Sequence, residues 1–189
     1  MIDCETYGRA LLTAKDYYRI ESSVVDLYKE LRITCFPIDP FKIAIKCGYE
    51  LIPYSSLDKD MQSFLRDSER AGTSGRTKNG TYRIFYDDYN VLTRQRFTIM
   101  HEIGHIRLGH KEDSQYAEKC ANYFATYSLA PSPAMSLLNC EDFVDVSLKF
   151  GISDESAIYS FDRYCRWFNV TNDLKPYEER LIELLENNI

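Results

Sequence analysis

The three histidines of this 189-residue chain all fall within ten residues, at His101, His105 and His110. The first two frame the sequence HEIGH, an H-E-x-x-H motif. On a helix, residues four apart share one face, so both imidazoles can point to a single zinc ion. Glu102 then lies close enough to take a proton from a water molecule beside the metal. The motif therefore predicts two metal ligands and a general base.

The residues around the motif are typical of a helix. Apolar-rich segments at 97–100 and 106–108 flank it, and Gly109 is well placed to end the helix. An ordinary pair of histidines on an amphipathic helix is the alternative. Because the chain holds only three histidines, chance seldom produces this motif, which favours the metal site.

A third protein ligand must come from elsewhere. In metzincins a glycine follows the second histidine by three residues, and a third histidine follows that glycine by three. Here Gly109 and His110 come four and five residues after His105, so the register is wrong. We therefore interpret His110 as a residue at the helix end or the pocket rim, where a cation is favourable against the helix dipole.

The thermolysin-like alternative takes a glutamate from a second helix. Glu118 begins a stripe at helical spacing that continues through Ala121, Asn122 and Ala125, and the small alanines allow two helices to approach closely. Glu118 is thus the predicted third ligand. Asn122, one turn further on, is a candidate partner that orients a histidine. An interior polar group bonded elsewhere explains Asn122 equally well.

At this point the chain resembles the ImmA/IrrE-type zinc metallopeptidases. The resemblance rests on RQRFTIM before HEIGH, LGH after it, the pattern E-x-x-A-N-x-F-A from Glu118, and LAP at 129–131. It extends over residues 20–170, with PIDP at 37–40 and FGIS at 150–153. Ala130 departs from the family, since many members have methionine there.

This resemblance implies a zinc endopeptidase with one catalytic ion. Family members cleave helix-turn-helix repressors, often encoded beside them in mobile elements, prophages or stress loci. The implied function is therefore site-specific cleavage of such a repressor. One alternative is a regulatory or toxin-like module that binds its partner without cleaving it, and another is a general peptidase. An intact Glu102 favours an enzyme. Two histidines and one glutamate also accept manganese, iron or cobalt.

Composition limits the other classes of function. The net charge of -6 and the pI near 5.2 argue against a broad electrostatic contact with nucleic acid. The six cysteines are scattered without a C-x-x-C pair, which favours reduced thiols. The chain has no apolar run of about 20 residues, and its first residues lack a signal-peptide core. We therefore predict a cytoplasmic protein without membrane or direct nucleic-acid contacts.

The remaining pattern predicts an α+β fold, a mostly helical zincin-like domain with about three strands beside the active-site helix. Strands are expected at 33–38, 50–53 and 81–86, with a loop or hairpin turn over the Gly/Ser/Thr-rich residues 71–80. Helices are expected at 41–47, 136–150, 154–167 and 177–187, and as a pair within 5–33 that breaks near 21–23.

We predict a single metallopeptidase domain over residues 1–189. It would comprise N-terminal helices at 1–33, a catalytic core with the sheet and the zinc helices at 34–131, and a C-terminal helical region at 132–189. An edge strand near the zinc can hold an extended substrate by backbone hydrogen bonds. We expect that edge at residues 81–86.

Overall fold

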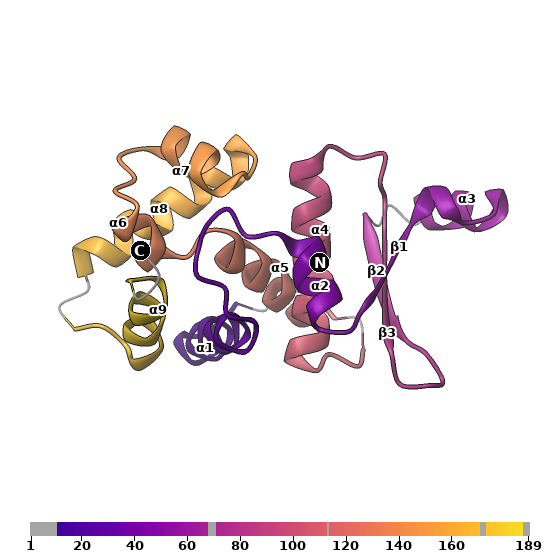
Figure 1. Cartoon of the computed structure of the whole chain (residues 1–189), viewed down its shortest axis with the longest axis horizontal. Coiled ribbons are helices and arrows are strands. Elements are labelled where there is room, and N and C mark those ends of the chain that lie inside the picture. Colours follow the sequence, from indigo (N-terminus) through magenta and orange to yellow (C-terminus); the bar gives the residue numbers. More distant parts are fainter. Residues whose placement is uncertain (1–10, 68–70, 113, 171–172, 187–189) are drawn as a thin grey trace, which may run out of the picture.

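The computed structural model describes residues 11–67, 71–112, 114–170 and 173–186. It is mostly helical, with a three-stranded sheet at one end (Figure 1), which confirms the predicted α+β class. The elements are, in chain order, α1 (Ala14–Leu31), α2 (Pro40–Lys46), β1 (Glu50–Pro53), the 3-10 turn η1 (Tyr54–Ser56), α3 (Lys59–Asp67), β2 (Gly72–Arg76), β3 (Tyr82–Tyr86), α4 (Leu92–Leu108), α5 (Gln115–Leu129), α6 (Ser132–Leu137), α7 (Phe143–Phe150), α8 (Asp154–Val170) and α9 (Pro176–Glu186).

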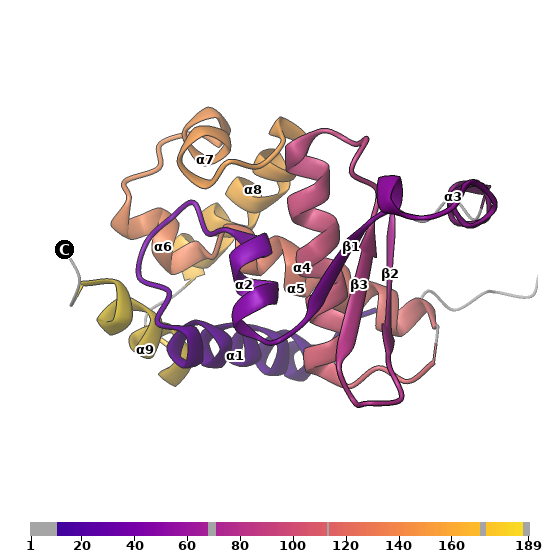
Figure 2. The same cartoon turned by 45° about the vertical axis from the view of Figure 1, so that its right-hand side comes forward.

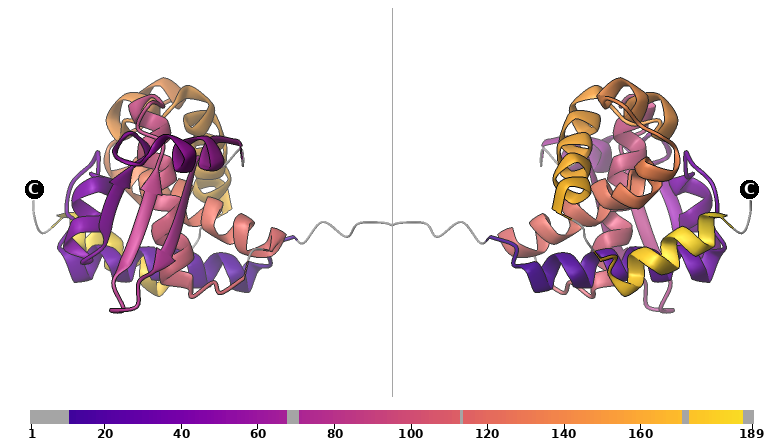
Figure 3. Two further views of the ribbon diagram at one scale, coloured as in Figure 1. Left: turned by 90° about the vertical axis from the view of Figure 1, so that its right-hand side faces the viewer. Right: turned by 90° about the vertical axis from the view of Figure 1, so that its left-hand side faces the viewer.

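Helix α4 lies between the sheet and the other helices. It packs against α2, α5 and strands β2 and β3 (Figure 2). Helices α6 to α9 form the end of the molecule opposite the sheet, and α1 packs against both α5 and α9. Figure 3 shows these two ends in turn, the sheet facing the viewer on the left and α8 and α9 on the right. Helices α4 and α5 are therefore central in the fold.

One hydrophobic cluster connects these parts. It includes the fully buried side chains of Leu27 in α1, Ile103 in α4, Phe124 in α5 and Leu181 in α9. Burying side chains of this size contributes about 1.5–3 kcal/mol each. The helix that carries the histidines is thus held by contacts that also fix the C-terminal helices.

The sheet corrects the expected edge strand. Its order is β1-β3-β2, with β1 parallel and β2 antiparallel to β3. Residues 82–86 are therefore the central strand, and residues 72–76, which we expected as a loop, form the edge beside α4. Glycine, which occurs twice in β2, has low strand propensity, so the pattern missed this strand. Pairing with β3 and packing on α4 hold it in place.

The expected strand at 33–38 is also wrong, because these residues form a loop that contains a cis peptide bond between Phe36 and Pro37. Here Ile38 is buried, and its carbonyl accepts a hydrogen bond from the Arg96 guanidinium at 2.8 Å. Apolar residues are thus buried without strand pairing. The strands at 50–53 and 81–86 are confirmed.

Helix boundaries differ from the prediction in two places. Within the described residues, α1 is one continuous helix, because the buried Glu21 accepts hydrogen bonds from the hydroxyls of Tyr123 and Tyr177. Residues 5–10 of the first expected helix lie outside the described residues. The stretch 136–150 is divided between α6 and α7, because Asn139 has a positive φ of 50° and Asp142 starts α7 as its N-cap. Helix α3 was not predicted.

The structure also bears on the expectations about membrane spans and cysteines. Within the described part of the chain, no helix has both the length and the apolar character needed to span a membrane. The cysteines in that part are all free thiols: Cys35, Cys47, Cys120, Cys140 and Cys165. The described fold is therefore held by packing and hydrogen bonds rather than by disulfides.

Candidate metal centre and active-site cleft

Helix α4 carries His101, Glu102 and His105, as the motif predicts. It ends at Gly109, which adopts φ +71°, a left-handed conformation that glycine reaches without a side-chain clash. The predicted helix end is confirmed. His110 follows directly, and its amide donates to the carbonyl of His105 at 3.0 Å. This bond turns the chain back toward the motif.

Helix α5 brings the second set of polar side chains. Ser114 caps its start by accepting a hydrogen bond from the Ala117 amide at 3.0 Å, which places Glu118 in the first turn. The two helices approach closely at Gly104, where an added Cβ would lie only 3.0 Å from the ring of Phe124. The glycine within the motif therefore sets the distance between the helices.

Glu118 lies beside both motif histidines. Its two carboxylate oxygens are each 3.4 Å from an imidazole Nε2, one on His101 and one on His105, and the two Nε2 atoms are 3.0 Å apart. One ligand atom from each residue lies within 4.8 Å of the others. Ligands about 2.1 Å from a tetrahedral zinc are separated by about 3.4 Å, so this donor set fits one such ion.

The other ring nitrogens of these histidines face protein partners. Nδ1 of His101 donates to Oδ1 of Asn122 at 2.9 Å, and the Nδ1 atoms of His105 and His110 share a hydrogen bond at 3.1 Å. A metal-ligating histidine uses its second nitrogen in this way to fix its ring orientation and tautomer. Asn122 thus lies where its proposed orienting role requires. Sequence spacing gave no signal for the contact of His110.

Electrostatics favour neutral imidazoles. Burial, followed by the nearby His105, lowers the pKa of His101 to about 4. The same two causes, in the same order, lower the pKa of His110 to about 4. His110 does lie at the helix end and line the cleft, but it is not the cation expected there, since burial and the nearby His105 and Arg19 disfavour its charged form. Neutral imidazole is the form that binds a metal ion.

Glu102 lies deeper than the ligands, with 6% of its surface exposed. A Cβ built on Gly72 would lie 3.6 Å from its Oε1, so its carboxylate is directly beside β2. The same Cβ would lie 2.4 Å from Thr98, which leaves no space for a side chain where β2 crosses α4. The close approach of β2 is what brings the edge strand to the general-base candidate.

These side chains surround a cleft of about 950 Å³. Strand β2 forms one wall through residues 72–74, and α4 and α5 form the other through the histidines, Glu102, Glu118 and Asn122. The sequence prediction missed the β2 wall, because nothing in a Gly/Ser/Thr-rich segment shows that it is a strand. An extended chain lying along β2 would pass in front of Glu102 and the metal donors.

The mixed sheet, the H-E-x-x-H helix and the glutamate on the next helix define a zincin-like domain of metallopeptidase type. Residues 51–161 match the Peptidase M78 family, described as the IrrE N-terminal-like domain. This match covers more than half of the chain, which therefore belongs to that family, and it confirms the resemblance seen in the sequence. No curated protein matches the chain significantly.

Proposed function

We propose that this protein is a zinc-dependent endopeptidase that cleaves a helix-turn-helix repressor at a specific site. The observation that carries the proposal is the convergence of His101, His105 and Glu118 on one wall of a cleft, with Glu102 buried beside them. Family membership supports a metallopeptidase-like activity. The repressor substrate comes from the resemblance to ImmA/IrrE-type enzymes.

In the proposed reaction, one set of residues would bind the ion, a second orients the ligands and Glu102 transfers the proton. His101, His105 and Glu118 would hold the ion, while Asn122 and His110 keep the two imidazoles oriented through their Nδ1 atoms. A bound zinc supplies Lewis acidity, which activates a water molecule and polarises the scissile carbonyl. Glu102 takes the proton from the attacking water and passes it to the departing amine. The edge of β2 offers backbone groups that position the peptide.

The test is to incubate the purified, zinc-loaded protein with the helix-turn-helix protein encoded nearest to its gene. A Glu102→Ala variant is the control, and intact-mass analysis is the readout. We expect two discrete fragments with the wild type and none with the variant. General acid–base catalysis typically contributes about 10²–10⁴-fold, so residual cleavage by the variant should be below about 1%.

Two other outcomes would contradict the proposal. A stable complex with an intact repressor in both samples would support a binding module instead. Equal digestion of casein, short peptides and the repressor would indicate a general peptidase. Metal content, measured by atomic emission, should stay near one ion per chain in the Glu102→Ala variant, because this glutamate is not among the converging donors.

A further inference from the structure

A second cavity lies on the other side of α5. It has a volume of about 1320 Å³ and lies between α1, α5, α8 and the start of α9. We call this cavity the aromatic groove. Its walls carry the tyrosine and aliphatic side chains of Leu11, Leu12, Tyr17, Tyr18, Tyr159 and Val170. Tyr159 is 66% exposed and Val170 is 76% exposed. Grouped apolar side chains that stay in water often mark a binding surface.

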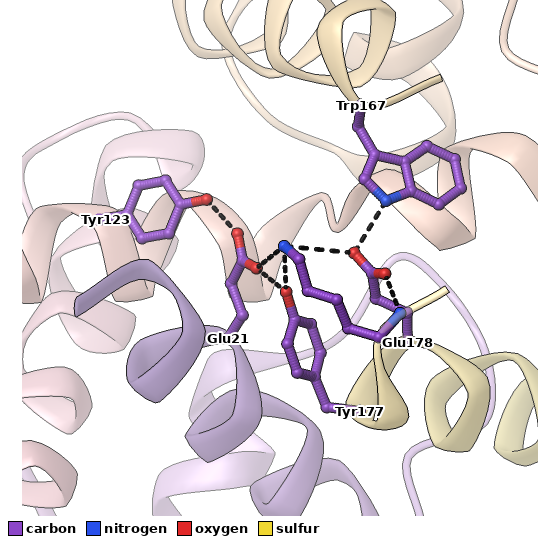
Figure 4. Close-up of polar contacts among 6 residues, drawn as sticks. Glu21, Tyr123, Trp167, Tyr177 and Glu178 are labelled. Atoms are coloured by element: carbon purple, nitrogen blue, oxygen red, sulfur yellow. Dashed lines mark hydrogen bonds and ion pairs between the residues drawn. The ribbon is translucent and has the colours of Figure 1, made fainter. Parts of the chain in front are cut away.

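The floor of the groove is a network of buried polar groups (Figure 4). Glu21 of α1 accepts hydrogen bonds from the hydroxyls of Tyr123 on α5 and Tyr177 on α9. The three side chains thus connect three helices beneath the apolar walls. Since the Glu21 oxygens are already bonded within the protein, they do not require a ligand.

A second buried carboxylate completes this floor. Glu178 accepts from the indole nitrogen of Trp167 at 2.8 Å and from the Lys175 amide at 2.7 Å. The ammonium of Lys175 lies 3.8 Å from Glu21 and 3.9 Å from Glu178, within reach of both carboxylates. The floor is therefore preorganised and bonded to itself, and what the groove offers an occupant is mainly apolar contact.

The rim of the groove carries a small excess of basic side chains. Lys119 and Arg166 line it, with Lys175 above the floor carboxylates that it pairs with, against Asp173, the one exposed carboxylate among the lining residues. The Arg166 side chain is 71% exposed, and its ion pair with Asp162 is a surface pair worth about 0–1 kcal/mol. A basic rim on a chain of net charge -6 favours an occupant with acidic side chains.

The groove adjoins the metal cleft along α5. Lys119 and Asn122 line both cavities, and they lie on the exposed face of α5 that also carries the metal donor Glu118. A polypeptide that leaves the cleft over this face of α5 enters the aromatic groove. Binding in the groove would thus add contacts to the substrate away from the bond that is cut.

We propose that the aromatic groove is a substrate-recognition site for a segment with a large apolar side chain between acidic residues. The inference rests on the proposed function, because it takes the protein substrate as the occupant. The apolar side chain packs between Tyr18, Tyr159 and Trp167, and the acidic neighbours face the basic rim. Specificity then depends on sequence at a distance from the scissile bond.

Trp167 makes a direct test possible, since it is the only tryptophan in the chain and lines the groove. The zinc-loaded, full-length protein is titrated with an acetylated, amidated pentapeptide that has one phenylalanine between two pairs of aspartates. We expect a saturable change in tryptophan emission. Added salt should weaken the affinity for the peptide, because it screens the attraction between the aspartates and the rim. The same peptide with serine in place of phenylalanine should not bind.

Variants of the groove locate the binding. Tyr159→Ala should weaken the binding of the peptide about tenfold, since an aromatic contact buried by the peptide contributes about 1.4 kcal/mol. Ile158→Ala is the matched control, because Ile158 is the neighbouring exposed residue on α8 and does not line the groove. Arg166→Glu should weaken the acidic peptide and strengthen its lysine counterpart.

Three results would overturn the inference. One is the absence of a saturable signal at millimolar peptide, and another is equal binding by wild type and Tyr159→Ala. The third is a wild type that sediments as a dimer and becomes monomeric on Tyr159→Ala, which would make a second copy the occupant. Peptide binding needs no cleavage, so it stands if the repressor is not cut. Repressor cleavage with unchanged KM in Tyr159→Ala would reject the groove and keep the protease.

Discussion

In the two cavities that flank α5, the pKa values of buried groups are shifted in opposite directions. In the metal cleft, burial lowers the pKa of His101 and His110 and keeps the imidazoles neutral, with the Nε2 atoms of His101 and His105 directed to a common point. In the aromatic groove, burial and the nearby Glu21 raise the pKa of Tyr123 and Tyr177, whose hydroxyls donate to that carboxylate. The cleft presents its polar atoms to a ligand, whereas the groove bonds its two buried carboxylates, Glu21 and Glu178, internally. One helix thus separates a site suited to chemistry from one suited to recognition.

The largest expected effect lies in the cleft, at Glu118. Glu118→Gln keeps the shape but loses the charge that offsets a dication, so zinc affinity should fall by more than about 100-fold. Competition with a chromogenic chelator measures this. Glu112→Gln is the matched control, because Glu112 lines the same cleft outside the converging donors. Equal zinc affinity in the two variants would remove Glu118 from the metal site.

The next effect concerns the partners of the imidazoles. Asn122→Ala and His110→Ala each remove a hydrogen bond to an Nδ1 atom, and loss of such a partner typically costs 10–100-fold in metal affinity. Tyr159→Ala in the groove should leave metal affinity unchanged. If His110→Gln, which can still accept from His105, does not recover affinity, the contact of His110 is structural only.

The local part of the cleft was predictable because its spacing lies within one helix. His101 and His105 are one turn apart, and the glutamate with its small neighbours on the next helix indicated a close helix pair. The motif glycine, Gly104, makes that approach possible in a way that spacing alone does not show, since an added Cβ would meet Phe124.

The rest of the site depends on contacts between distant residues. Strand β2 forms because β3 and α4 hold a segment that has little strand preference of its own. The groove was harder to predict from the sequence, because Glu21 contacts Tyr123 and Tyr177, which are 102 and 156 residues away in the chain. The polar stretch at 21–23 was therefore interpreted as a helix break, when Glu21 in fact faces inward. Tertiary partners decide such positions.

The pH dependence of the metal-free protein should separate the two cavities. A histidine with a folded pKa of about 4 binds fewer protons than the unfolded chain, so stability falls as pH drops from 6.5 toward 4. His101 alone should contribute about 2 kcal/mol of this loss. The groove tyrosines have raised folded pKa values, so they keep protons that the unfolded chain loses, and stability falls as pH rises above 10.

Urea denaturation at a series of pH values measures both the acid limb, below pH 6.5, and the alkaline limb, above pH 10, of the stability profile. His101→Gln should flatten the acid limb and leave the alkaline limb unchanged, and Tyr123→Phe should do the reverse. A single variant that changes both limbs equally would show that the two cavities are coupled through α5 rather than independent.

The smallest single effect, that of Tyr127→Phe, is seen by comparing two tyrosines of α5 that lie one helical turn apart. Tyr123 donates to Glu21, so Tyr123→Phe leaves a buried carboxylate short of a donor and should cost about 1.5–3 kcal/mol of unfolding free energy. The Tyr127 hydroxyl is also buried, but within the described residues it has no hydrogen-bond partner. Tyr127→Phe should therefore be neutral or slightly stabilising by urea denaturation. A comparable loss in both variants would mean that the hydroxyl of Tyr127 is bonded within the floor network and is not a polar group left over for an occupant of the groove.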